Sequence, residues 1–128
     1  MLNNSVIRGK LRIKECNVKE VTDLNNTEVG GLTDFSKTTL GSAIFTKTNF
    51  KDIAVFTETI FSESIDFKYT TFEKLAIFSN SEFRRTLNFE NTIFRENVNC
   101  LNMIALMENR ETARIIKHSF EKINNSWM

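Results

Sequence analysis

The chain has no proline, four glycines, two cysteines and a single histidine among its 128 residues. Proline lacks a backbone donor and is excluded from the interior of hydrogen-bonded strands, so its absence suits a backbone that is paired along most of its length. The only histidine, His118, leaves no Cys-His cluster with metal-ligand spacing. The sequence also has no glycine-rich phosphate loop and no nucleophile elbow. We therefore expect no catalytic residues, no metal site and no cofactor.

The chain also lacks an excess of charge of either sign, and it lacks long apolar runs. The chain carries 17 Lys/Arg and 16 Asp/Glu, divided 13 and 13 before Ala105 and 4 and 3 after it. This balance offers no single-sign field to nucleic acid or to a membrane surface. The apolar runs reach about five residues, far below the ~20 that span a bilayer. Met1 to Val6 contains no Lys or Arg, whereas a signal peptide begins with a positively charged region. We expect a cytoplasmic protein with no membrane span that binds no nucleic acid.

Phenylalanine, in contrast, recurs at a fixed period. Ten of the 12 phenylalanines are separated alternately by five and six residues, which makes an 11-residue repeat. They are Phe45, Phe50, Phe56, Phe61, Phe67, Phe72, Phe78, Phe83, Phe89 and Phe94. No α-helix or alternating strand has this spacing, so it predicts a stack of similar coils with the rings inside.

A second column repeats with the same period. Side chains of an extended segment alternate between faces, so the residue two before each Phe should also point inward. This column is small or β-branched: Ala43, Thr48, Ala54, Thr59, Ile65, Thr70, Ala76, Ser81, Leu87, Thr92 and then Val98. The same register runs backward through the centres Leu40, Phe35, Val29, Leu24, Val18, Ile13 and Ile7. The step from Leu40 to Phe45 is one residue short, and Gly41 predicts a tightened corner there.

The pattern, as in Ala54-Val55-Phe56-Thr57-Glu58, resembles the pentapeptide-repeat family over about residues 7 to 100. It is similar to the variant of that family with Phe centres and alternating five- and six-residue steps. The family's Asp or Asn before the centre is kept in places, as at Asp23, Asp34, Asn49, Asp66 and Asn88. The resemblance implies an all-β solenoid, a right-handed quadrilateral parallel β-helix with four units per coil and about 4 to 5 coils.

Taking every fourth centre predicts four inner stacks. They are Ile13, Phe35, Phe56, Phe78 and Cys100; Val18, Leu40, Phe61 and Phe83; Leu24, Phe45, Phe67 and Phe89; and Val29, Phe50, Phe72 and Phe94. Cys16 and Cys100 are then almost four coils apart, beyond disulfide reach at ~4.8 Å per coil. We expect both as buried free thiols.

The period changes after the repeats, which predicts a β-helix over residues 1–104 and a capping helix and tail over 105–128. One apolar stripe at helical spacing marks the helix: Ala113, Ile116, Phe120, Ile123 and Trp127. Two interpretations stay open. The helix packs over the last coil as a cap, or its stripe pairs with a second copy to form a homodimer.

One edge of the tower is predicted to carry aliphatic residues on an otherwise polar outside. Leu32, Ile53 and Leu75 are the inserted sixth residues of one corner, and Val55 and Ile77 precede centres on the adjoining face. The five side chains either fold inward as extra core or form an edge for protein binding or self-association.

We therefore expect a non-enzymatic protein-interaction scaffold with an unidentified protein partner. The alternative implied by the resemblance is a DNA-mimicking modulator of a type II topoisomerase (gyrase). That activity needs a strongly acidic surface, which the balanced charge does not offer.

Overall fold

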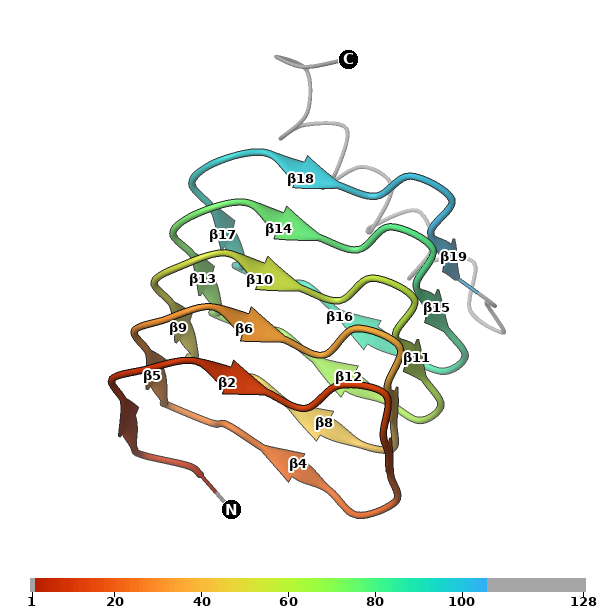
Figure 1. Cartoon of the computed structure of the whole chain (residues 1–128), viewed down its shortest axis with the longest axis horizontal. Coiled ribbons are helices and arrows are strands. Elements are labelled where there is room, and N and C mark those ends of the chain that lie inside the picture. The colour runs from red at the N-terminus through yellow and green to blue at the C-terminus, as the bar shows by residue number, and fades with distance from the viewer. Residues whose placement is uncertain (1, 106–128) are drawn as a thin grey trace.

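The computed structural model describes residues 2–105, and these residues form a tower of stacked coils (Figure 1). The tower is built from 19 strands of two residues each, joined by short turns, and the described residues contain no helix. The strands are β1 (Val6–Ile7), β2 (Leu11–Arg12), β3 (Asn17–Val18), β4 (Thr22–Asp23), β5 (Glu28–Val29), β6 (Thr33–Asp34), β7 (Thr39–Leu40), β8 (Ala43–Ile44), β9 (Asn49–Phe50), β10 (Ala54–Val55), β11 (Ile60–Phe61), β12 (Ile65–Asp66), β13 (Thr71–Phe72), β14 (Ala76–Ile77), β15 (Glu82–Phe83), β16 (Leu87–Asn88), β17 (Ile93–Phe94), β18 (Val98–Asn99) and β19 (Ile104–Ala105).

Every strand pairs in parallel with the fourth strand before or after it, so one coil contributes one strand to each of four sheets. The sheets run β1-β5-β9-β13-β17, β2-β6-β10-β14-β18, β3-β7-β11-β15-β19 and β4-β8-β12-β16. We call the second sheet the β10 sheet and the fourth the β12 sheet. The register places Phe61 beside Phe83 and Phe72 beside Phe94. The predicted parallel solenoid with four units per coil is confirmed, and so are the four inner stacks.

The core is a set of stacked phenylalanine rings. Phe56 is fully buried and lies parallel to Phe78, with ring centroids 5.0 Å apart and planes at 5°. This distance follows from the ~4.8 Å spacing of neighbouring coils. Rings of different stacks meet edge to face, as Phe67 does with Phe78 at 88°, which is a favourable arrangement of ring quadrupoles. Each buried ring stabilises the fold by roughly 1.5 to 3 kcal/mol.

The turns alternate between two kinds. The turns that follow the β10-sheet and β12-sheet strands contain one residue with positive φ, and these residues recur through the tower. They are Asn4, Glu15, Asn26, Lys37, Lys47, Glu58, Tyr69, Asn80, Asn91 and Asn102, with φ between 54° and 59°. Many of these turns are also capped by the side chain before the centre. The Asp66 carboxylate, for example, accepts a hydrogen bond from the Lys68 amide at 2.8 Å.

The tightened corner is confirmed. Only Gly41 and Ser42 connect β7 to β8, whereas residues 62–64 connect the equivalent strands β11 and β12. Gly41 is buried, and its amide donates to the Val18 carbonyl of the coil before it at 3.0 Å. The shortened turn therefore keeps the pairing between coils in register.

The expectation of two buried thiols is wrong, although the two cysteines do not form a disulfide with each other. Cys16 is exposed and Cys100 is half-buried. Cys16 belongs to the first coil, whose strands have a neighbouring coil on one side only. Its inward position therefore borders the open end of the tower, where the Sγ atom donates to the Lys14 carbonyl at 2.9 Å. The predicted helix and tail lie outside the described residues apart from Ala105, which ends β19.

Candidate interaction edge

The five predicted edge residues come together on the β10 sheet. Val55 and Ile77 are register partners on β10 and β14. Ile53 and Leu75 immediately precede these strands, and the Ala54 amide donates to the Leu75 carbonyl at 3.1 Å. Leu32 holds the same place before β6, since the Thr33 amide donates to the Ile53 carbonyl at 3.0 Å. We call these five residues the aliphatic edge.

The aliphatic edge lies outside the core. All five side chains are half-buried, while Ala54, Phe56 and Ala76 between them are fully buried and point inward. None of the five belongs to the core cluster or to the partly buried residues that pack against it. This placement favours the interpretation of the five residues as an edge, and both interpretations stay predictions.

Charged side chains flank the aliphatic edge, and most of them are paired. On the corner beside it, Lys51 lies 3.6 Å from Glu28, Lys74 lies 3.7 Å from Glu96 and Arg95 lies 2.9 Å from Glu73. These pairs join neighbouring coils and are largely exposed, so each contributes at most about 1 kcal/mol. Their effect on the surface is larger than their effect on stability, because they cancel charge beside the apolar side chains.

A hollow closes the C-terminal end of the aliphatic edge. It has a volume of about 360 Å³ and is lined by Leu75, Asn97, Val98, Asn99 and Leu101. Leu101 is two-thirds exposed, although its side chain is apolar. The apolar surface therefore continues past Leu75 toward the last described coil.

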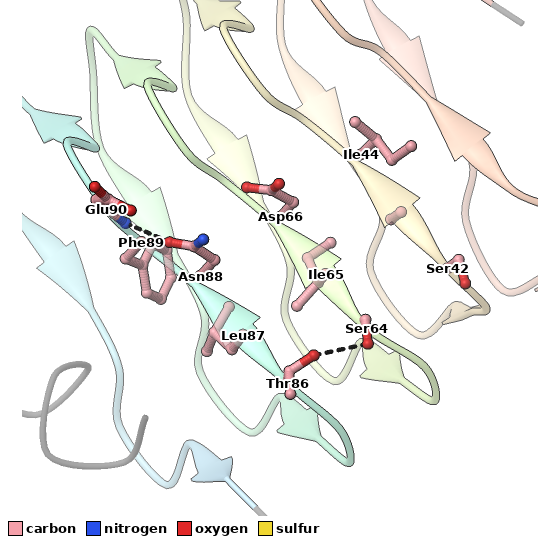
Figure 2. Close-up of a pocket in the computed structure, with 11 residues that line it drawn as sticks. Ser42, Ile44, Ser64, Ile65, Asp66, Thr86, Leu87, Asn88, Phe89 and Glu90 are labelled. Atoms are coloured by element: carbon pink, nitrogen blue, oxygen red, sulfur yellow. Dashed lines mark hydrogen bonds between the residues drawn. The ribbon is translucent and has the colours of Figure 1, made fainter. Parts of the chain in front are cut away.

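A second surface feature, which the sequence did not predict, is a groove of about 620 Å³ on the β12 sheet. The groove crosses β8, β12 and β16, and its lining includes Ile44, Asp66 and Asn88, which are the second residues of these strands (Figure 2). Ser42, Ser64 and Thr86 line one border. Their recurrence at one repeat position is the sequence signal that could have pointed to the groove.

The polar atoms of this groove are used by the fold itself. The hydroxyls of Ser64 and Thr86 are hydrogen-bonded to each other at 2.7 Å (Figure 2). The Asn88 amide oxygen accepts from the Glu90 amide at 2.8 Å, in the same kind of turn that Asp66 caps. A hydroxyl paired with another hydroxyl has no base to activate it as a nucleophile. The groove is thus a less specific site than the aliphatic edge.

Ionisable groups give no sign of a reaction centre within the described coils. No three His, Cys, Asp or Glu side chains gather there as a metal ion would require. Burial raises the pKa of the Cys100 thiol, which keeps the thiol neutral and poorly nucleophilic. The same residues contain no helix long and apolar enough to cross a membrane.

A family model matches the repeat independently of the spacing argument. The family model described as pentapeptide repeats (9 copies) matches residues 13–60, 45–93 and 56–103. The chain belongs to the pentapeptide-repeat family. This is a family of structural repeats that is not typically catalytic. No curated protein and no solved structure matches the chain.

The other predicted surface, the stripe Ala113, Ile116, Phe120, Ile123 and Trp127, lies outside the described residues. The capping and homodimer interpretations therefore both stay predictions. The aliphatic edge is the predicted site that lies within the described residues.

Proposed function

We propose that this pentapeptide-repeat protein is a non-enzymatic scaffold that binds another protein through the aliphatic edge. The observation that carries the proposal is the stacking of five partly exposed aliphatic side chains on consecutive coils, outside the core. Scattered exposed aliphatic residues are ordinary, but a contiguous apolar patch rimmed by polar groups is typical of a binding surface. A rigid solenoid presents such a patch without an ordering cost on its own side.

The DNA-mimic alternative receives no support from the charge distribution. The coils from residue 2 to residue 105 carry 13 Lys/Arg and 13 Asp/Glu. Basic residues lie on several sides of the tower, including Lys37, Lys47, Lys68 and Arg84. An imitation of duplex phosphates needs a row of uncompensated negative charge. In a gyrase supercoiling assay we expect no inhibition and no protection at micromolar protein, and either effect would reverse this ranking.

The experiment that tests the proposal is a quantitative affinity capture with charge-substituted variants. The double variant Ile53→Lys and Leu75→Lys should lose a partner that the wild-type protein captures from its source cells. Its melting temperature should change by only a few degrees, because both side chains are surface groups whose replacement costs little.

Two matched variants separate the surfaces. Ile60→Lys alters a half-buried aliphatic residue on a different sheet and should leave capture unchanged. Ile44→Lys alters the groove of the β12 sheet and should also leave it unchanged. If the edge variant keeps every partner, or if it unfolds while the Ile60 variant stays folded, the aliphatic edge is not the binding surface.

A further inference from the structure

The two residue columns that form the aliphatic edge continue into positive charge at the N-terminal end. Because Leu11 is the register partner of Thr33, Lys10 lies beneath Leu32. Arg12 is the partner of Asp34, in the column that continues to Val55 and Ile77. Both basic side chains are exposed, and neither has an ion-pair partner among the described residues.

The acidic residues nearby make other contacts and form no ion pair with Lys10 or Arg12. The buried Asp34 carboxylate accepts from the Ser36 amide at 2.9 Å and lies 3.7 Å from Lys14. Asp52 uses its carboxylate to accept from the Ile53 amide at 2.7 Å. At the other end the two columns finish in the neutral amides of Asn97 and Asn99. Along the column that runs from Lys10 through Leu32, Ile53 and Leu75 to Asn97, the surface is therefore first cationic, then aliphatic and then neutral.

The spacing of the coils favours an α-helix as the occupant. Neighbouring coils are ~4.8 Å apart, and successive turns of an α-helix rise 5.4 Å. Over the two steps from Leu32 to Leu75 the mismatch is about 1 Å for a helix. Same-face side chains of an extended strand are ~6.7 Å apart, so a strand would be out of register by about 4 Å.

The corner next to Leu32 is open to a close approach. Gly9, Gly30 and Gly31 occupy it and carry no side chains. Gly31 is packed so tightly that a Cβ atom there would lie 2.8 Å from the Gly9 carbonyl oxygen. The backbone shelf beside the cationic end is thus bare, and acidic side chains of a docked helix can reach Lys10 and Arg12.

We infer that the aliphatic edge receives an amphipathic α-helix of a partner protein whose apolar stripe ends in carboxylates. This inference rests on the proposed function and specifies the partner's chemistry. The four coil steps from Lys10 to Asn97 cover about 19 Å, which corresponds to about 13 helical residues. The helix is held by its stripe against Leu32, Ile53 and Leu75, and its acidic end selects the direction in which it lies.

The test uses two synthetic helical peptides of that length with the same Leu/Ile stripe, one ending in glutamates and the other in lysines. Binding to the full-length protein is measured by fluorescence anisotropy at low salt. The glutamate peptide should bind at least ~10-fold tighter than the lysine peptide. The double variant Lys10→Glu and Arg12→Glu should reverse this preference, and Ile53→Lys should abolish binding of both peptides.

A matched double variant, Lys19→Glu and Lys68→Glu, changes the net charge equally away from the aliphatic edge and should keep the preference. Equal, Ile53-dependent binding of both peptides would overturn the inference while leaving the proposed function standing. Absence of binding would also overturn it, and so would equal affinity for a proline-interrupted, non-helical peptide. A concentration-dependent dimer that Ile53→Lys dissociates would show that the occupant is a second copy.

Discussion

Threonine residues of this tower differ in whether their hydroxyl groups are hydrogen-bonded. Thr48, Thr59 and Thr92 donate their hydroxyls to carbonyls of the preceding coil, at 2.6, 2.8 and 2.7 Å. Thr22 and Thr33 are buried like Thr48 and Thr59, but their hydroxyls have no partner among the described residues. The first kind links coils, whereas the second leaves a polar atom desolvated without compensation.

This difference predicts opposite effects of one substitution. Thr59→Val removes the donor to the Phe35 carbonyl and should lower the free energy of unfolding by ~1 to 3 kcal/mol, because the carbonyl stays buried. Thr33→Val should leave it unchanged or raise it by up to ~1 kcal/mol. Urea denaturation of both variants provides the comparison. Equal losses would mean that side-chain shape, and not the hydroxyl, sets the cost.

At the scale of the elements, the turns contain a strain that the sequence does not announce. Ten turn residues have positive φ, and five of them are Asn, which tolerates this conformation well. The other five are Glu15, Lys37, Lys47, Glu58 and Tyr69. For such side chains the left-handed region costs roughly 1 to 2 kcal/mol per residue, and the pairing between coils holds them there.

Relief of this strain should stabilise the protein. Glu58 has φ of 55°, and its amide donates to the Ser79 carbonyl at 3.0 Å, a backbone bond that a substitution keeps. Glu58→Asn should raise the free energy of unfolding by up to ~1 kcal/mol, measured by thermal or urea unfolding. The control Glu63→Asn removes the same charge at an exposed residue without positive φ, and it should bring no gain. A similar gain in both variants would assign the effect to charge.

The sequence predicted most of the features that depend on the 11-residue period of the repeat. The register and the short corner at Gly41 follow from spacing, because a one-residue slip would turn every Phe outward, whereas the four stacks also needed the four units per coil that the family resemblance implies. The five positive-φ residues that are Lys, Glu or Tyr were not predicted, since these residue types carry no turn signal. The groove at Ser42, Ser64 and Thr86 depends on side-chain directions that a period does not give. Cys16 is exposed because it lies in the first coil, whose strands pair with a neighbouring coil on one side only. A repeat pattern does not show this difference between the first coil and the others.

At the scale of the whole molecule, each coil pairs with its neighbours, so among the described residues the middle coils have two partners and the first and last described coils have one. Burial follows this pattern. Phe67 is fully buried and stacks on both Phe45 and Phe89, with ring centroids 5.1 and 5.0 Å away. Phe94, in the last described coil, is half-buried and stacks on Phe72, with ring centroids 4.9 Å apart. In the first coil Ile7 and Leu11 are likewise only partly buried.

The cost of removing a ring should therefore depend on its height in the tower. Phe67→Ala opens a cavity between two rings and should lower the free energy of unfolding by ~3 to 5 kcal/mol. Phe94→Ala should cost roughly half as much, because the ring is only partly buried and its removal leaves a less enclosed cavity. Urea denaturation measures both losses, and amide exchange should show the Phe94 variant opening locally in its last coils. Equal losses, with exchange accelerated throughout in both variants, would mean that the tower unfolds as one unit whose end coils are as strongly held as its centre.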